Sequence, residues 1–274
     1  MIKQNLESIL GKLPSGVQLV AVSKFHPVER LMEAYDAGQR IFGENRPQEL
    51  AAKVPQMPSD VQWHFIGHLQ TNKLKMVLPY ASLVQSVDSF HLLEAINNWG
   101  AANNKVIDIL LELHLGAEET KQGFSEEEIL SIIASSEGVP SETLQCVGAS
   151  SWRSSERPAE AGSEGLIGRE PQGDNRGAEP PSKPGVAKVS EATPLPMANI
   201  RIRGLMGMAT HTENEALIEK DFERIESLFN KIKAIGLPYF DTLSIGMSGD
   251  WPLAVKHGAT MVRIGTDIFG PREY

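Results

Sequence analysis

The stretch Val20-Ala-Val-Ser-Lys-Phe-His-Pro27 predicts a short buried strand that carries Lys24 to its carboxyl end. A lysine in this position can be a reactive amine. It can equally be the solvated end of a strand, because lysine side chains are mostly exposed in folded proteins. Residues far downstream in the chain bear on the choice between these two interpretations.

Two downstream segments resemble each other in composition: Leu243-Ser-Ile-Gly-Met-Ser-Gly-Asp250 and Val262-Arg-Ile-Gly-Thr266. Each places small residues and hydroxyl groups directly after a short apolar run. Such loops are often ordinary turns, but their backbone N–H groups and hydroxyls can also surround a phosphate. A lysine amine together with a phosphate loop indicates pyridoxal 5′-phosphate (PLP) as a cofactor.

Composition excludes several classes of protein. The chain has 274 residues, of which 41% are hydrophobic, so one large α/β domain with a sizeable core is expected. A formal net charge of -9 argues against nucleic-acid binding, which needs a basic surface. Cys146 is the single cysteine, and this excludes both a disulfide framework and a site with several thiolate ligands.

The sequence contains no apolar run of membrane-spanning length, and the first residues, Met1 to Leu6, lack the apolar core of a signal peptide. We therefore expect a soluble, cytoplasmic protein that binds neither nucleic acid nor membrane, and we expect it to be a monomer.

Short apolar runs rich in β-branched residues alternate with amphipathic stretches, which is typical of βα units and a parallel sheet. The expected strands are Val17–Val22, Arg40–Phe42, Gln62–Ile66, Leu83–Val87, Ile107–Leu113, Ile200–Met208, Thr242–Ile245 and Met261–Ile264. The expected helices are Ile2–Leu13, Val28–Ala37, Pro47–Lys53, Asn72–Leu78, Ser89–Asn103, Ser125–Ser135, Asn214–Ala234 and Trp251–His257.

This alternation favours an α/β fold of the TIM type, a (β/α)8 barrel with one extra amino-terminal helix. An open doubly wound sheet is the alternative. It is disfavoured because the first strand is not followed by the Gly-x-Gly-x-x-Gly turn of dinucleotide-binding proteins.

Residues 136–197 interrupt the pattern. They are crowded with Ser, Glu, Gly, Pro and Arg and show no sustained periodicity. Such a composition buries too little apolar surface to offset the entropy lost on ordering, so we predict a disordered insertion between the fifth helix of the barrel and its sixth strand. The expected organisation is a single barrel domain over 1–274 that this insertion interrupts.

Several motifs fall at the carboxyl ends of the expected strands. They are Lys24, Gly43-Glu-Asn45, the run Trp63 to Lys73, Gly204-Leu-Met-Gly-Met208, Ser244-Ile-Gly-Met-Ser248 and Arg263-Ile-Gly-Thr266. In this combination the chain closely resembles the pyridoxal phosphate homeostasis protein family, whose fold is similar to the amino-terminal barrel of alanine racemase. The resemblance covers nearly the whole chain outside the insertion.

The resemblance implies a set of cofactor-binding residues. Lys24 would hold PLP through a Schiff base, with Asn45 and Met206 near the ring. Arg263 would lie beside the pyridine nitrogen and leave it unprotonated, which makes the ring a weaker electron sink. The phosphate would be bound by residues of the last two loops, at the usual phosphate site of such barrels. These are Ser244, Ser248, Gly265 and Thr266.

By the same resemblance, we expect a protein that buffers or delivers PLP inside the cell with little or no turnover, and its partners would include PLP-dependent apoenzymes. The alternative is an amino-acid racemase. Full alanine racemases add a second domain that supplies a catalytic tyrosine, and the sequence given ends soon after the eighth strand, at Tyr274. A Schiff-base aldolase is a third possibility, although its lysine generally lies later in the barrel.

No metal site is expected. His64 and His68 are four residues apart, but this spacing crosses a strand and a turn instead of following one helical face. We therefore expect hydrogen-bonding or packing roles for both imidazoles.

Overall fold

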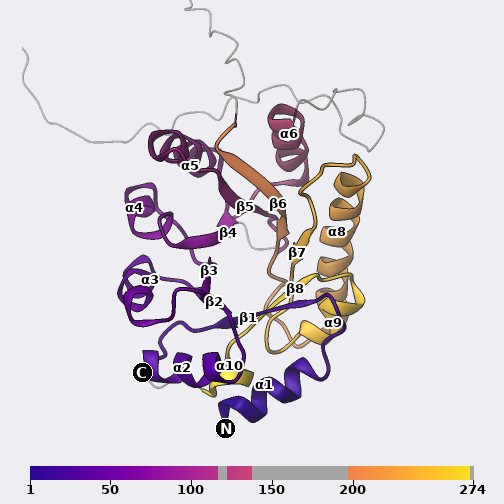
Figure 1. Cartoon of the computed structure of the whole chain (residues 1–274). Helices are drawn as coiled ribbons and strands as arrows, with labels where there is room; N and C mark the ends of the chain where they lie inside the picture. The colour runs from indigo at the N-terminus through magenta and orange to yellow at the C-terminus, as the bar shows by residue number, and fades with distance from the viewer. Residues whose placement is uncertain (117–121, 138–196, 272–274) are drawn as a thin grey trace, which may run out of the picture.

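The computed structural model describes residues 1–116, 122–137 and 197–271. Eight parallel strands close into a barrel in the order of the sequence, and the helices surround it (Figure 1). The strands are β1 (Gln18–Val22), β2 (Ile41–Glu44), β3 (Gln62–Phe65), β4 (Ala81–Val87), β5 (Ile107–Glu112), β6 (Ile200–Met206), β7 (Thr242–Ser244) and β8 (Met261–Ile264). The predicted barrel is thus confirmed.

The helices follow the predicted order, with small shifts at their ends. They are α1 (Ile2–Leu10), α2 (Val28–Asp36), α3 (Pro47–Lys53), α4 (Leu74–Val77), α5 (Phe90–Asn103), α6 (Glu126–Glu137), α8 (Glu215–Lys233), α9 (Trp251–Lys256) and α10 (Thr266–Phe269). Short 3₁₀ turns precede α4 and follow α3. The four-residue α10 is not expected from the sequence, because so short a segment has no measurable periodicity.

Pairing of β1 with β8 closes the barrel. Val20 lies opposite Arg263, and Ala21 lies opposite Ile264. Since both strands run in the same direction, their carboxyl ends meet at the same rim. Residues almost a whole chain length apart, such as Lys24 and Thr266, therefore both reach one cavity at this rim.

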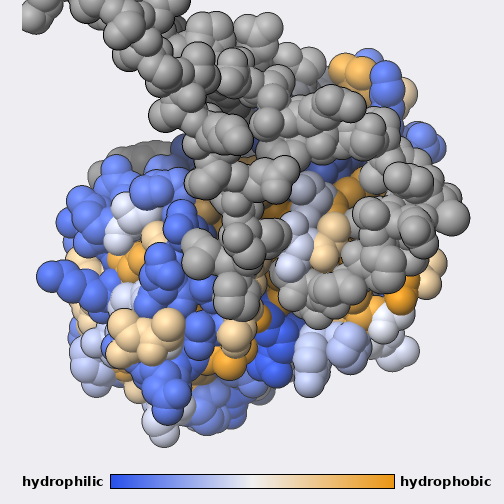
Figure 2. Space-filling model, turned by 90° about the horizontal axis from the view of Figure 1, so that it is seen from above, coloured by the Kyte–Doolittle hydropathy of each residue, from blue (hydrophilic) through white to orange (hydrophobic). Residues whose placement is uncertain are grey.

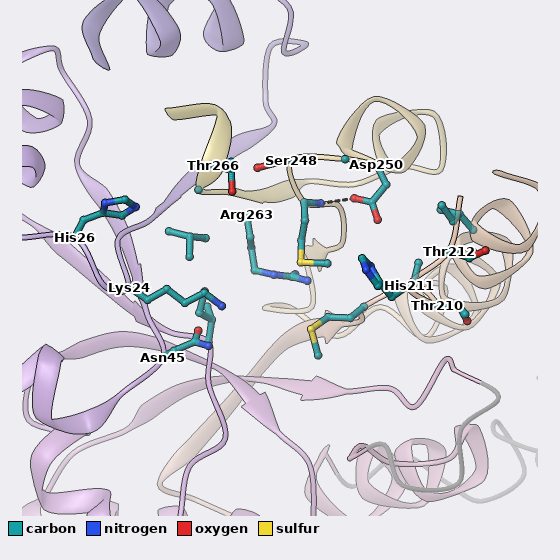
Figure 3. Close-up of a pocket in the computed structure, with 18 residues that line it drawn as sticks. Lys24, His26, Asn45, Thr210, His211, Thr212, Ser248, Asp250, Arg263 and Thr266 are labelled. Atoms are coloured by element: carbon teal, nitrogen blue, oxygen red, sulfur yellow. Dashed lines mark hydrogen bonds between the residues drawn. The ribbon is translucent and has the colours of Figure 1, made fainter. Parts of the chain in front are cut away.

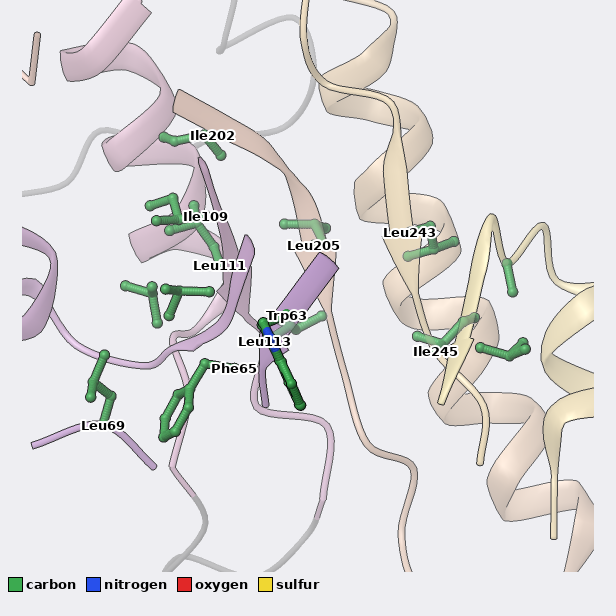
Figure 4. Packing of buried hydrophobic residues seen from close by; sticks show 14 of the residues in the cluster. Trp63, Phe65, Leu69, Ile109, Leu111, Leu113, Ile202, Leu205, Leu243 and Ile245 are labelled. Atoms are coloured by element: carbon green, nitrogen blue, oxygen red, sulfur yellow. The ribbon is translucent and has the colours of Figure 1, made fainter. Parts of the chain in front are cut away.

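Two hydrophobic cores stabilise the barrel. The larger one lies between the strands and the surrounding helices and includes Phe65, Leu111 and Leu205 (Figure 4). A smaller cluster is formed by alternate residues of the strands, Val20, Leu83, Leu110, Met206 and Met261. Because these five residues come from strands all around the barrel, they fill its interior, as expected for a packed barrel core.

The amino-terminal helix α1 packs against α10, the helix that follows β8. Its buried residues, Ile2, Leu6 and Ile9, follow the spacing of one helical face. The Asn5 side-chain amide donates a hydrogen bond of 3.0 Å to the carbonyl of Ile268 in α10. The extra helix therefore holds the segment that follows β8.

Most of the predicted insertion, residues 138–196, lies outside the described residues. Among the helices that are described, none is both long and apolar enough to cross a membrane. In the view from above, hydrophilic residues dominate the described surface, and hydrophobic ones are scattered among them (Figure 2).

We predict that Gly204 is a position where the barrel tolerates no side chain. Its φ is +153°, and a Cβ there would lie 1.8 Å from the carbonyl oxygen of Thr242 on the adjacent strand. Gly204→Ala should lower the free energy of unfolding by about 3 kcal/mol or more, from backbone strain and overpacking together. Urea unfolding followed by circular dichroism measures this loss.

Gly16→Ala is the matched control, because Gly16 has a φ of +95° but nothing within 4 Å of a Cβ. It should cost only the backbone strain, about 1–2 kcal/mol. Equal losses for the two variants would show that the contact with Thr242 is unimportant.

Candidate functional site

A cavity of about 380 Å³ opens at the carboxyl ends of the strands, where active sites of such barrels are found (Figure 3). Most of the site residues predicted from the sequence line it. These are Lys24, Asn45, Ser248, Arg263, Gly265 and Thr266. Lys24 extends into the cavity from the β1 side toward Arg263, and His211 lies on the opposite side (Figure 3).

The segment after β1 has an unusual backbone. Phe25, directly after Lys24, has a φ of 68°, which is rare for a residue other than glycine. A bulky residue adopts this conformation only where its surroundings enforce it. Its backbone N–H donates a hydrogen bond of 3.0 Å to the Glu49 carboxylate in α3. The lysine is therefore held on a sharply defined turn.

Asn45 is positioned by a close approach between two loops. A Cβ on Gly67 would lie 2.2 Å from the backbone oxygen of Asn45, so only glycine allows the loop after β3 to pass the loop after β2 at this distance. The contact places Asn45 on the wall of the cavity beside Lys24 (Figure 3).

Arg263 is a buried cation at the floor of the cavity. Its guanidinium donates to the Ser244 carbonyl and Ser244 Oγ, both at 2.7 Å, and to the Gly207 carbonyl at 2.9 Å. Burial lowers the pKa of Arg263 to about 10, while the Glu112 and Asp250 carboxylates oppose this shift. The side chain therefore stays charged at neutral pH and is held in one orientation.

A chain of hydrogen bonds continues from Arg263 through the barrel interior. Ser244 Oγ donates to Gln85 Oε1 at 2.7 Å, and Gln85 Nε2 lies 2.9 Å from Nδ1 of His64. Since an amide nitrogen can only donate, His64 accepts at Nδ1. Burial lowers the pKa of His64 to about 4, so its ring is neutral.

Glu112 is a buried carboxyl group whose charge acts on Arg263. Burial, followed by the charge of Asp88, raises the pKa of Glu112 to about 7, while Arg263 opposes the shift. The carboxyl group therefore changes charge near neutral pH, close enough to Arg263 to affect its electrostatics.

The loop after β7 folds back on α9. Gly246 has a φ of +93°, and a Cβ there would lie 2.6 Å from the Ala254 side chain, so glycine is required. The Asp250 carboxylate accepts a hydrogen bond of 2.5 Å from the Met247 N–H. The backbone N–H groups of Ser248 and Gly249 donate no hydrogen bond within the described residues. Two donors are thus left at the rim of the cavity.

The loop after β8 is equally well anchored. The Ile268 N–H donates to the Gly265 carbonyl at 3.0 Å, and the Gly270 N–H donates to the Thr266 carbonyl at 2.8 Å. The Phe269 ring stacks on His26, with 4.8 Å between the ring centroids. These contacts fix Thr266, which lines the cavity together with Ser248 (Figure 3).

Two of the predicted residues lie below the cavity instead of lining it. Met206 belongs to the hydrophobic cluster inside the barrel, and Ser244 is fully buried, where it holds Arg263. Other residues that are not among the predicted cofactor-binding residues also line the cavity. They are Val22, His26, Ile66, Met208, Ala209, Thr210, His211, Thr212, Ile218, Met247, Gly249 and Asp250.

Much of this unexpected lining belongs to the segment between β6 and α8. The run Thr210-His-Thr212 offers a signal that could have been used, because polar side chains directly after a barrel strand fall at the rim of the active site. Met208 lies two residues after Met206, so in an extended strand both side chains would face the same way. The sequence does not show that the strand ends at Met206, which leaves Met208 to line the cavity.

The cavity combines one amine, one fixed guanidinium and a rim of hydroxyl and N–H donors. The rim suits an anion such as a phosphate, since hydroxyls and unpaired N–H groups bind anions. The Lys24 amine suits a carbonyl group, with which it can form a covalent bond. The arrangement is therefore suited to a ligand that carries both a phosphate and a reactive carbonyl.

Comparison with known proteins places the chain in a family. Residues 1–161 match the family described as "Alanine racemase, N-terminal domain". The pyridoxal phosphate homeostasis protein of Vibrio alginolyticus is 31% identical over an alignment of 288 residues, which covers 100% of this chain and 98% of the relative. The protein of the same name from Schizosaccharomyces pombe is 31% identical, covering 93% of this chain and 84% of the relative.

Solved structures agree with these relatives. PipY of Synechococcus elongatus, with PLP bound, is 28% identical with a TM-score of 0.70, and the match covers 98% of this chain and 100% of PipY. Alanine racemase of E. faecalis, at 14% identity and a TM-score of 0.59 over 98% of this chain and 57% of that one, shares the fold. The chain belongs to the pyridoxal phosphate homeostasis protein family.

Proposed function

We propose that this protein binds PLP through Lys24 and serves in PLP homeostasis, by buffering the cofactor or delivering it, with little or no turnover. The observation that carries the proposal is that the Lys24 amine and the hydroxyl and N–H groups of the last two loops face one cavity. The relatives are named for PLP homeostasis, and the PipY structure contains PLP, which supports the same assignment.

The donor set matches the chemical groups of PLP. Ser248, Gly249, Gly265 and Thr266 supply small residues, hydroxyls and N–H groups for the phosphate. The cofactor would supply an aldehyde, and the Lys24 amine would bond to its carbon, losing its two protons with the aldehyde oxygen as water.

Arg263 would face the ring. Its three hydrogen bonds to Ser244 and Gly207 keep the guanidinium in place, and its charge would keep a neighbouring ring nitrogen unprotonated. Such a ring would withdraw electrons weakly, and Arg263 would then do little to help remove a proton from a bound amino acid. We therefore assign Arg263 to binding. Asn45 lines the same wall and would contact the ring beside Lys24.

Ser244 and Met206 would support the site without lining the cavity. Ser244 fixes Arg263, and Met206 belongs to the apolar layer on which the site rests. We further propose that the protein is a cytoplasmic monomer whose partners include PLP-dependent apoenzymes.

An amino-acid racemase is the second candidate, and His211 favours it. Racemisation needs proton-transfer groups on both sides of the substrate, and His211 lies across the cavity from Lys24 (Figure 3).

We predict that Lys24 is the only covalent attachment point for PLP. The purified protein mixed with PLP should show a visible absorbance band that sodium borohydride removes, and Lys24→Ala should abolish that band because no amine is left to bond the aldehyde. Lys73→Ala is the control, since Lys73 lies in the turn before α4, outside the cavity, and should leave the band unchanged. A band of full intensity in Lys24→Ala would refute the assignment.

We also predict poor racemisation. The PLP-loaded protein, incubated with L-alanine or L-serine, should form the D-isomer far more slowly than about 1 per second, a rate ordinary for enzymes. The reason is the charged Arg263 beside the ring. Chiral chromatography measures the D-isomer. Turnover at an ordinary rate that is lost in His211→Ala would favour the racemase instead.

A further inference from the structure

A buried network of charges surrounds the backbone on both sides of Lys24. It consists of Ser23 and Phe25, the neighbours of Lys24 in the sequence, together with Glu44 at the end of β2 and Glu49 and Lys53 in α3. None of these side chains lines the cavity. The network therefore reaches the site through the backbone that carries Lys24.

Ser23 is fixed on the amino-terminal side. It is fully buried, and its hydroxyl lies 2.6 Å from Glu44 Oε1. Its carbonyl accepts a hydrogen bond of 2.9 Å from Nζ of Lys53, and its N–H donates to the Gly43 carbonyl at 3.0 Å. The residue before Lys24 thus uses its N–H, carbonyl and hydroxyl in contacts with neighbouring elements.

Phe25 is fixed on the carboxyl-terminal side. The Glu49 carboxylate accepts the hydrogen bond from its N–H, and the guanidinium of Arg46 lies 4.4 Å from the centre of its ring. These two contacts hold the strained φ of 68°. Because this φ sets the direction of the chain directly after Lys24, it also affects where the lysine side chain points.

Lys53 joins the two sides. Its ammonium contacts Ser23 O at 2.9 Å, Glu44 Oε1 at 2.7 Å and Glu49 Oε2 at 3.2 Å. An ammonium has three protons, so all of its donors are used. Its side chain is only 8% exposed, and that of Glu44 is 0% exposed.

Stability alone does not account for such a pair. Removing two charges from water costs several kcal/mol per ion, and apolar residues of similar volume often stabilise a core at least as well. Glu44 Oε2 is buried and has no hydrogen-bond partner among the residues that the structure describes. The pair thus lacks one hydrogen bond, yet Lys53 contacts the Ser23 carbonyl and, through Glu49, is linked to the Phe25 N–H. A role in positioning Lys24 explains these contacts better than a role in stability.

We infer that Lys53, with Glu44 and Glu49, is a positioning device that holds the Lys24 amine in the orientation required for bonding to the PLP aldehyde. This inference rests on the proposed function and names residues that it does not include. A positioning group should affect how fast the bond forms and leave the noncovalent binding of the cofactor unchanged.

The test separates these two quantities. Stopped-flow absorbance at saturating PLP gives the rate constant for bond formation. Fluorescence titration with pyridoxine 5′-phosphate, which has an alcohol in place of the aldehyde, gives the noncovalent affinity. For Lys53→Met we expect the rate constant to fall about tenfold or more, while the dissociation constant for pyridoxine 5′-phosphate changes less than about twofold.

Glu49→Ala covers the case in which Lys53→Met folds poorly, because Glu49 is partly exposed and its loss leaves the buried pair intact. We expect it to slow bond formation severalfold by releasing the Phe25 N–H. Glu49→Gln should restore most of the rate, since its amide oxygen can still accept that hydrogen bond.

Asp108→Asn is the matched control for a general loss of stability. Asp108 pairs with Arg201 and Arg203 at 2.7 and 3.1 Å, near the start of β5 and β6 and away from the cavity. It should lower the melting temperature without changing the rate of bond formation.

Three results would overturn the inference. The first is an unchanged rate in both Lys53→Met and Glu49→Ala. The second is an equal slowing in Asp108→Asn at the same loss of stability. In both cases the unaltered protein still bonds PLP, and the proposed function stands. The third is an unaltered protein that never bonds PLP, which removes the proposed function as well.

Discussion

Closure of the barrel by β1 and β8 is the constraint on which the site depends. The register that sets Val20 opposite Arg263 also brings the ends of these two strands to the same rim. Lys24 from one end of the chain then faces a cavity that Thr266 from the other end also lines. Helix α1 reinforces this closure, because the Asn5 side-chain amide donates a hydrogen bond to the carbonyl of Ile268 in α10, the helix that follows β8.

The packing of the barrel interior explains why Arg263 is fixed in one orientation and stays charged. An apolar layer of Val20, Leu83, Leu110, Met206 and Met261 fills the lumen. Within the same interior, the side chains of Ser244 and Gln85 meet across the barrel and hold Arg263 in one orientation. Burial desolvates the guanidinium without neutralising it, since its lowered pKa of about 10 still leaves it charged. Under the proposed function, such a fixed charge would lie beside the cofactor ring, where it suits binding better than proton transfer.

The sequence predicts the strands well because their apolar, β-branched runs are local signals, and it places Lys24 at the cavity because the lysine directly follows such a run. The features that the sequence does not predict depend on contacts between residues on different elements. Lys53 looks like the solvated end of an amphipathic helix, yet it is buried, and Glu44 and Ser23, 9 and 30 residues away on other elements, supply its acceptors. Whether Ser244 lines the cavity or supports Arg263 depends on a bond to Gln85, 159 residues away, which no local pattern indicates.

The proposed function depends on one lysine, Lys24 directly after β1, holding the cofactor. Mass spectrometry tests it most directly. The protein is loaded with PLP, reduced with borohydride, digested with trypsin and mapped. The account predicts that the reduced phosphopyridoxyl group is found on the peptide spanning 13–30, at Lys24, with stoichiometry near one. A label spread over several surface lysines, or concentrated at a lysine outside the cavity, would contradict it.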